Sequence, residues 1–167
     1  MKKYSAGILT YKTNDDGQLA VLLVHPGGPF WVKKDLGAWS VPKGEHEPDE
    51  EPLVAAKREY REETGQPLPN GEYIDLGETK LKDGKTVSVW AAQGEVNLST
   101  VISNKFEMEW PPHSGQRQSF PEIDRADWFS LDEAAAKLSS GQAVFLSRLA
   151  EKLGVKAPSL PEQQHLL

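Results

Sequence analysis

Three glutamates, Glu59, Glu62 and Glu63, lie three and four positions apart in the stretch REYREETG, residues 58–65. If this stretch is helical, the three carboxylates share one face of the helix. Glu59 and Glu63 would then form a like-charge pair, which costs an isolated helix roughly 0.2–0.5 kcal/mol. A hard divalent cation such as Mg²⁺ or Mn²⁺ requires an oxygen-rich cluster of this kind and would relieve the repulsion. The alternative is a solvated acidic face, balanced in part by an Arg58–Glu62 pair.

The composition of the chain narrows the class of partner. The chain has 167 residues, a formal net charge of −6 and no cysteine. Its basic residues are scattered, which argues against a sequence-independent nucleic-acid binder. No apolar run approaches membrane-spanning length, and the N-terminus enters a strand pattern without the apolar core of a signal peptide. We therefore expect a single cytoplasmic domain over residues 1–167 that binds neither nucleic acid nor membrane, and the oligomeric state stays open.

A helix must position the acidic cluster, and the flanking residues predict its ends. We expect it over residues 51–63, because Pro52 suits a first helical turn and Gly65 is placed to terminate it. One face of this helix is lined by Leu53, Ala56 and Tyr60. Before the helix, apolar runs predict antiparallel strands at residues 6–11 and 19–25 and a short strand at residues 39–41.

The second half of the chain predicts a hairpin, a long polar segment and two helices. Residues 73–81 and 86–96 alternate around the Asp-Gly turn of KDGK, which is a strong hairpin signal. Residues 97–121 are polar and contain prolines and the strand-like stretch FEMEW, and we expect a long loop or a bent extension there. Trp128 and Phe129 predict a short strand, and Ser130 with Glu133 forms a capping-box signature. That helix should run to about residue 138, a second one from about 143 to 153, and the tail, about 157–167, should be flexible.

The full acidic segment, GEHEPDEEPLVAAKREYREETG, resembles the box of the Nudix hydrolase family, G-x5-E-x7-R-E-U-x-E-E-x-G-U, where U is a bulky aliphatic residue. Seven fixed positions match in register: Gly44, Glu50, Arg58, Glu59, Glu62, Glu63 and Gly65. Two positions of the box, which spans residues 44–66, depart from the pattern, because Tyr60 is aromatic and Gln66 is polar. Both are packing positions in the family, so only local packing is placed in doubt.

The resemblance implies an α/β fold, a Nudix-type α/β/α sandwich with a mixed β-sheet. It also implies that Glu59, Glu62, Glu63 and the Gly44 carbonyl bind the metal. Arg58 would orient a catalytic glutamate, and Glu50 would either contact a residue that binds the metal or serve a purely structural role. Independently of the resemblance, Arg58 lies four residues before Glu62, where a guanidinium can hold a carboxylate.

The family's reaction is hydrolysis of a nucleoside diphosphate linked to another group, by attack of water on phosphorus. Metal would neutralise the phosphate oxygens, position the water and lower its pKa. In several family members a glutamate in a loop beyond the box accepts the proton or completes the metal site, and Glu122 in FPEIDRADWF stands in that place. Glu107 and Glu109 are rivals for this role, and so is a box glutamate. Each of the three downstream acids has an alternative interpretation as an ordinary surface residue.

Contacts to the nucleotide substrate have weaker candidates. The resemblance places Lys43 at the mouth of the phosphate site, with a solvated turn lysine as the alternative. Trp31, Trp90 and Trp110 could stack on a nucleobase, although such residues more often belong to the core. Residues 97–121 combine prolines with Trp and Arg, a composition that suits a preorganised substrate-side segment better than a plain linker.

Three later segments, FEMEWPP, QSFPEIDRADWF and GQAVFLSRL, resemble a bacterial Nudix subgroup described as predicted NTP pyrophosphohydrolases. We therefore expect nucleoside triphosphates or dinucleoside polyphosphates as substrates in preference to ADP-ribose or nucleotide sugars. The alternative is a catalytically silent, nucleotide-binding regulatory module of the same fold. Such modules commonly lose box glutamates, and this chain retains all of them.

Overall fold

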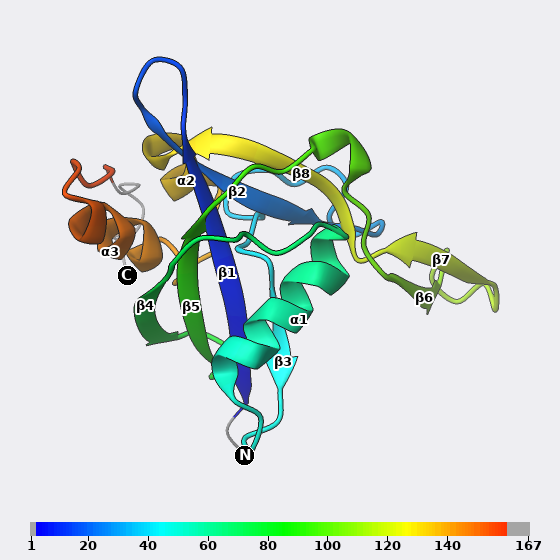
Figure 1. The fold of residues 1–167 in the computed structure, drawn as a ribbon. Coiled ribbons are helices and arrows are strands. Elements are labelled where there is room, and N and C mark those ends of the chain that lie inside the picture. Colours follow the sequence, from blue (N-terminus) through cyan, green and yellow to red (C-terminus); the bar gives the residue numbers. More distant parts are fainter. Residues whose placement is uncertain (1–2, 160–167) are drawn as a thin grey trace.

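A computed structural model describes residues 3–159. In it the strands build a central sheet, and helices lie on either side of that sheet (Figure 1). The last eight residues of the predicted flexible tail, 160–167, lie outside the described residues. Six strands build the sheet: β1 (Tyr4–Thr13), β2 (Leu19–Pro26), β3 (Lys43–His46), β4 (Tyr73–Lys80), β5 (Thr86–Gln93) and β8 (Ile123–Ser130).

The sheet has the order β4-β5-β1-β2-β8, and β3 pairs with the first half of β1. The β1–β5 pairing is parallel and the other pairings are antiparallel, which confirms the predicted mixed sheet. Strands β2 and β3 share one edge of β1, since β2 pairs with residues 11–13 and β3 with residues 4–7. The segment that begins the box is thereby fixed to the central strand.

Helices cover both faces of the sheet (Figure 1). On one face α1 (Pro52–Thr64) packs on β1, where its buried Ala56 and Tyr60 meet Ile8. On the other face α2 (Leu131–Lys137) and α3 (Val144–Leu153) cover a larger cluster that includes Leu9 and Leu23. Successive side chains of β1 therefore point to opposite faces of the sheet and belong to two separate cores. The predicted α/β sandwich is confirmed. No helix within residues 3–159 has the length and apolar character needed to cross a membrane.

The predicted helix ends agree with the structure because they rest on local chemistry. Helix α1 begins at Pro52 and ends before Gly65, which has φ 66° and donates its N–H to the Arg61 carbonyl at 2.8 Å. That left-handed conformation favours glycine. The capping box at the start of α2 is also present, with hydrogen bonds in both directions between Ser130 and Glu133.

Two strand predictions differ from the structure, and the strand β3 was not predicted. Residues 39–41 make only isolated bridges, from Trp39 to Leu138 and from Ser40 to Val24. The next strand along the chain is β3, which begins one residue before the box, where the sequence predicted no strand. The predicted short strand at Trp128 is the end of the eight-residue β8, whose exposed charged residues, Asp124, Arg125 and Asp127, break the apolar alternation that indicates a strand.

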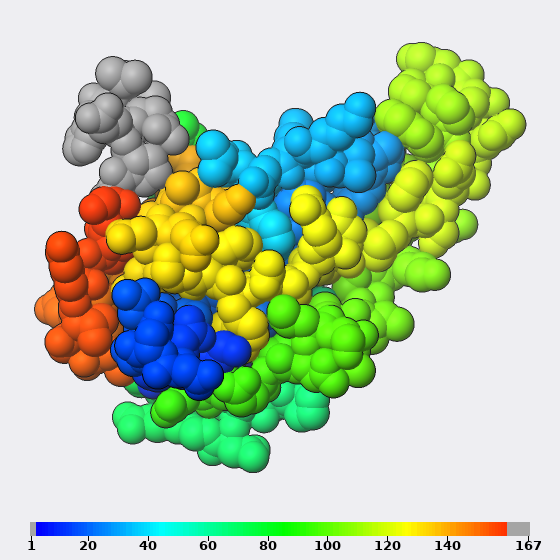
Figure 2. Space-filling view, turned by 90° about the horizontal axis from the view of Figure 1, so that it is seen from above, coloured from blue at the N-terminus to red at the C-terminus, as the bar shows by residue number. Residues whose placement is uncertain are grey.

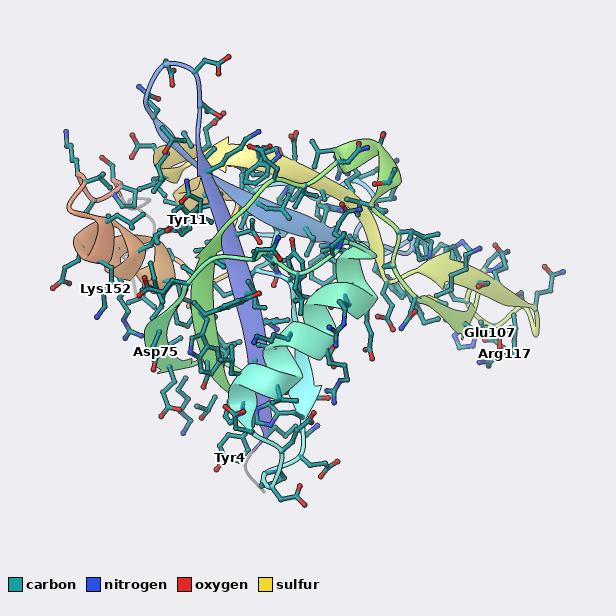
Figure 3. The ribbon with its side chains drawn as sticks, viewed as in Figure 1. Tyr4, Tyr11, Asp75, Glu107, Arg117 and Lys152 are labelled. Atoms are coloured by element: carbon teal, nitrogen blue, oxygen red, sulfur yellow. The ribbon has the colours of Figure 1, made fainter. Side chains whose placement is uncertain are left out.

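The predicted loop or extension at 97–121 is largely a projecting hairpin (Figures 1 and 3). A short 3₁₀ turn, Leu98–Thr100, precedes its strands, β6 (Lys105–Glu109) and β7 (Arg117–Pro121). An isolated two-stranded hairpin is marginally stable in water. Here the loop after β2 packs against it, because the ring of Phe106 lies next to Gly28 and the ring of Trp110 meets the ring of Phe30.

Candidate active site

The structure brings Gly44 against the carboxylate of Glu59. Gly44 lies in β3, opposite Ala6 of β1, and α1 packs across the same strands. A Cβ atom built at position 44 would lie 2.0 Å from Oε2 of Glu59, so only glycine leaves room for this carboxylate. Two of the four residues predicted to bind metal are therefore neighbours in space.

Glu63 lies one helical turn further along α1 and is held by the backbone of β3. Its Oε1 accepts the N–H of Lys43 at 3.0 Å. Burial raises the pKa of Glu63 to about 8, and the negative charges of Glu59 and Glu122 act in the same direction against the Lys43 N–H. Burial also raises the pKa of Glu59. These two carboxyl groups resist ionisation unless positive charge is supplied to them.

Arg58 joins the acids behind the cluster. Its Nη1 donates to Oε2 of Glu50 at 2.5 Å, and its Nη2 donates to Oε1 of Glu59 at 3.1 Å. The predicted i, i+4 contact to Glu62 is longer, with 3.8 Å between Nε and Oε1. The planar guanidinium therefore fixes Glu59 directly and faces Glu62 through charge alone.

The predicted metal ligands differ in their exposure. The side chain of Glu62 is 43% exposed, whereas that of Glu59 is 15% exposed. Within the described part of the chain, no three His, Asp or Glu side chains converge into a ready metal cage. The donor set still fits Mg²⁺ or Mn²⁺, because it offers carboxylate oxygens beside the Gly44 backbone and two acids whose ionisation requires positive charge. The ligand roles stay predictions.

Glu122 lies between β7 and β8, at the root of the hairpin, and its backbone is held on both sides. Its N–H donates to the Asn104 carbonyl and its carbonyl accepts the Gly27 N–H, both at 2.8 Å. The Asn104 N–H donates to the Glu62 carbonyl at 3.3 Å. The hairpin root is thereby tied to the last turn of α1, and the exposed Glu122 is near enough for its charge to raise the pKa of Glu63.

The rival acids lie elsewhere. Glu107 is exposed on the projecting hairpin (Figure 3), and Oε1 of Glu109 accepts the N–H of His113 at the hairpin turn.

Of the three tryptophans considered for base stacking, Trp90 packs half-buried against the α1 core, and Trp31 and Trp110 lie outside it. The structure therefore distinguishes Trp90, which packs against the core, from Trp31 and Trp110, which the sequence alone could not separate from it.

Lys43 contacts the acidic cluster through its backbone. Its Cβ faces Gly7, where an added Cβ would lie 2.7 Å away. The neighbouring Ala6 and Ile8 point to the α1 core, so the Lys43 side chain leaves the sheet on the opposite face. Burial lowers the pKa of its amine. The predicted contact between this side chain and phosphate stays a prediction.

Both departures from the family pattern are buried and hydrogen-bonded. The hydroxyl of Tyr60 accepts from Oγ1 of Thr10 at 3.3 Å, which fastens α1 to β1. The amide of Gln66 donates to Oγ1 of Thr100 at 3.0 Å and holds the 3₁₀ turn beside the end of α1. Sequence reasoning missed Thr10 and Thr100, because each lies at least 34 residues from its partner. The available signal in the sequence was that Tyr60 and Gln66, which carry hydrogen-bonding groups, occupy positions where the family pattern has apolar residues.

Comparison with known proteins identifies the fold. A family model described as NUDIX domain matches residues 1–149. The Ap4A hydrolase of C. elegans, solved as a binary complex, is 20% identical, with 91% of this chain and 98% of that chain covered and a TM-score of 0.59. The Nudix hydrolase RenU of M. smegmatis is 22% identical, with 92% and 88% covered and a TM-score of 0.57.

A domain complexed with ADP ribose also shares the fold. The NUDIX domain of Shewanella oneidensis NrtR, complexed with ADP ribose, is 17% identical, with 92% of this chain and 89% of that chain covered and a TM-score of 0.60. At such identities the likeness concerns the fold. Among curated protein sequences, none matches this chain.

Proposed function

Since this chain belongs to the NUDIX domain family of hydrolases, which act on acid anhydrides, we propose that it cleaves a phosphoanhydride bond in a nucleoside di- or triphosphate derivative with Mg²⁺ or Mn²⁺. The observation that carries the proposal is the burial of Glu63 and Glu59 beside Gly44, which raises the pKa of both acids. An arrangement that disfavours charge in its own carboxylates is suited to receiving a cation.

The roles we assign follow the positions of the side chains. A bound cation supplies charge neutralisation at the phosphate oxygens and lowers the pKa of a water molecule. Arg58 keeps the Glu59 carboxylate in one orientation. Glu122 accepts the proton of the attacking water, an assignment supported by its place at the hairpin root, which is tied to α1 beside Glu63, whereas Glu107 and Glu109 lie on the projecting strand β6. The oxygens we expect to hold the cation come from Gly44, Glu59, Glu62 and Glu63.

For the substrate we favour nucleoside triphosphates or dinucleoside polyphosphates over ADP-ribose and nucleotide sugars. The support is the resemblance of three downstream segments to the bacterial subgroup of predicted NTP pyrophosphohydrolases. The structural neighbours include an Ap4A hydrolase and a domain complexed with ADP ribose. One panel of these four substrate classes, read by product chromatography, decides between them, and a clear preference for ADP-ribose would reverse our order.

Turnover distinguishes an enzyme from a silent binding module. We expect Glu62→Gln to reduce hydrolysis nearly to background while the fold survives, because an exposed carboxylate loses its charge at constant volume. Glu51→Gln is the matched control, since Glu51 is exposed and makes no side-chain capping hydrogen bond at the start of α1. Wild-type protein that binds nucleotides with metal yet yields no product from the panel would favour the regulatory module.

A further inference from the structure

A cluster of large apolar side chains is exposed in the loop that follows β2. Phe30 is 59% exposed and Trp31 is 40% exposed. The rings of Phe30 and of Trp110, which lies in the hairpin, pack edge to face, with their centroids 5.4 Å apart and their planes at 81°. We call these three residues the aromatic platform. Figure 2 shows the loop, in light blue, beside the yellow-green hairpin. Exposed apolar patches of this kind mark binding surfaces.

The loop that carries the platform is fixed by hydrogen bonds. The Trp31 N–H donates to the Gly28 carbonyl at 3.2 Å, and the Lys34 N–H donates to the Trp31 carbonyl at 2.9 Å. Below them the fully buried His25 contacts the Lys34 carbonyl through Nε2 at 2.6 Å and Oδ1 of Asp124 through Nδ1 at 2.8 Å. The rings are therefore presented in a preorganised arrangement, which reduces the entropy lost on binding.

The loop that carries the platform contacts the backbone of Pro121 and Glu122, at the edge of the candidate active site. Gly27, three residues before Phe30, donates its N–H to the carbonyl of Glu122. A Cβ atom at Gly27 would lie 2.0 Å from the Pro121 carbonyl oxygen, so the loop and the hairpin root are in close contact. A ligand whose phosphates reach the acidic cluster could therefore extend past Glu122 along the loop toward Phe30.

The charges around the platform indicate the chemistry of its ligand. Lys33 and Lys34 are exposed in the same loop, and the Lys34 amine lies 4.9 Å from the centroid of the Trp31 ring. The chain as a whole carries a net charge of −6, so this pair is a local concentration of positive charge. Exposed aromatic rings beside cations suit a ligand that combines a flat ring with phosphate groups.

We propose that the aromatic platform stacks on the base of the substrate nucleotide, with Trp31 as the main contact and the packed pair of Phe30 and Trp110 as a further apolar surface. This inference rests on the proposed function, because it assigns the base-binding part of that same site. It also defines a substrate class, since a polyphosphate that lacks a base would gain nothing from the platform.

Binding is measured first, because it does not require turnover. Isothermal titration calorimetry compares two probes in the presence of Mg²⁺: a nucleoside triphosphate whose bridging oxygens are replaced by methylene groups, and inorganic tripolyphosphate. We expect Trp31→Ala to weaken binding of the nucleotide analogue about tenfold and to leave tripolyphosphate binding unchanged. Trp31→Phe should keep most of the affinity. Leu36→Ala is the matched control, since Leu36 is 71% exposed in the same loop outside the platform.

Kinetics provide the second readout. On the nucleotide that the wild type hydrolyses, Trp31→Ala should raise KM about tenfold with little change in kcat, because stacking far from the reacting phosphorus is present in ground and transition states alike. An equal loss on both calorimetric probes, or no loss on either, would overturn the platform. So would a sedimentation experiment in which wild-type protein self-associates and Trp31→Ala does not, since the patch would then join two copies.

The two proposals fail in different ways. If the wild type binds tripolyphosphate as tightly as the nucleotide analogue, the platform proposal is contradicted and the proposed hydrolase function is not. A wild type that binds neither probe in the presence of Mg²⁺ would remove the proposed function and, with it, the platform.

Discussion

The backbone N–H of Lys43 donates to Oε1 of Glu63 at 3.0 Å, which joins the last turn of α1 to the strand that begins the box. Burial raises the pKa of the Glu63 carboxyl group to about 8, although the hydrogen bond itself acts in the opposite direction. In metal-free protein near neutral pH, Glu63 therefore keeps its proton, and a cation that uses its oxygens must displace that proton.

The affinity for metal should consequently depend on pH. Proton and cation compete for Glu63 below a pH of about 8, so we expect the affinity for Mg²⁺ or Mn²⁺ to rise by up to about tenfold per unit between roughly pH 6 and 8 and to level off above. Calorimetry in buffers of different ionisation enthalpy measures the proton released. Glu63→Gln should bind weakly without this dependence, and a flat profile in the wild type would contradict the site.

Metal should also stabilise the folded chain. A cation that binds only the folded state stabilises it by roughly 2.7 kcal/mol at a hundredfold excess over its Kd. We expect saturating Mn²⁺ or Mg²⁺ to raise the Tm of the wild type and of Glu51→Gln, and to raise that of Glu59→Gln much less. Thermal unfolding followed by circular dichroism gives the three shifts. Identical behaviour of Glu59→Gln and the wild type would count against Glu59 as a ligand.

The parts of the fold that were predictable depend on neighbours in sequence. Pro52 and Gly65 set the ends of α1, and Ser130 with Glu133 caps α2, because each signal acts within one helical turn. The spacing of Glu59 and Glu63 likewise predicted a shared helical face, and in the structure both carboxyl groups face β3, Glu59 at Gly44 and Glu63 at the Lys43 N–H. Local rules therefore predicted the helices and the position of the acidic cluster.

The parts that were missed depend on partners distant in sequence. Strand β3 exists because residues 43–46 meet residues 4–7, and β6 pairs with β7 across a turn without the short Asp-Gly signal. The placement of Glu122 beside the cluster requires backbone contacts from Gly27 and Asn104. None of these pairings is encoded in a local pattern, so they appear only in the folded chain.

The Thr10–Tyr60 hydrogen bond should contribute to stability, although the family pattern has an apolar residue at position 60. Both residues are fully buried, so Tyr60→Phe leaves the Thr10 hydroxyl without this partner at a cost of about 1–3 kcal/mol. We expect Thr10→Val to cost a similar amount, and the double variant to be more stable than the sum of the two losses predicts. Urea unfolding of the four proteins measures the coupling, and strict additivity would show that the contact contributes nothing.

Gly44→Ala tests whether the contact between β3 and Glu59 serves activity more than folding. The added methyl group would lie 2.0 Å from Oε2 of Glu59, the far end of a flexible side chain, so the carboxylate can turn away while α1 stays in place. We expect kcat/KM to fall roughly 10²-fold, as for other misplacements of a catalytic group by about 1 Å, with little change in the Tm of the metal-free protein.

The control for that variant is Gly71→Ala, where the new Cβ would meet only the Gln93 carbonyl oxygen, at 3.8 Å, and both activity and Tm should be preserved. A cycle with Glu59→Ala completes the argument, because Gly44→Ala should cost little further activity once the carboxylate that it displaces is absent. Two independent, additive losses would mean that Gly44 acts on the reaction through some atom other than the Glu59 carboxylate. A large fall in the metal-free Tm would instead make the Gly44–Glu59 contact part of the fold itself.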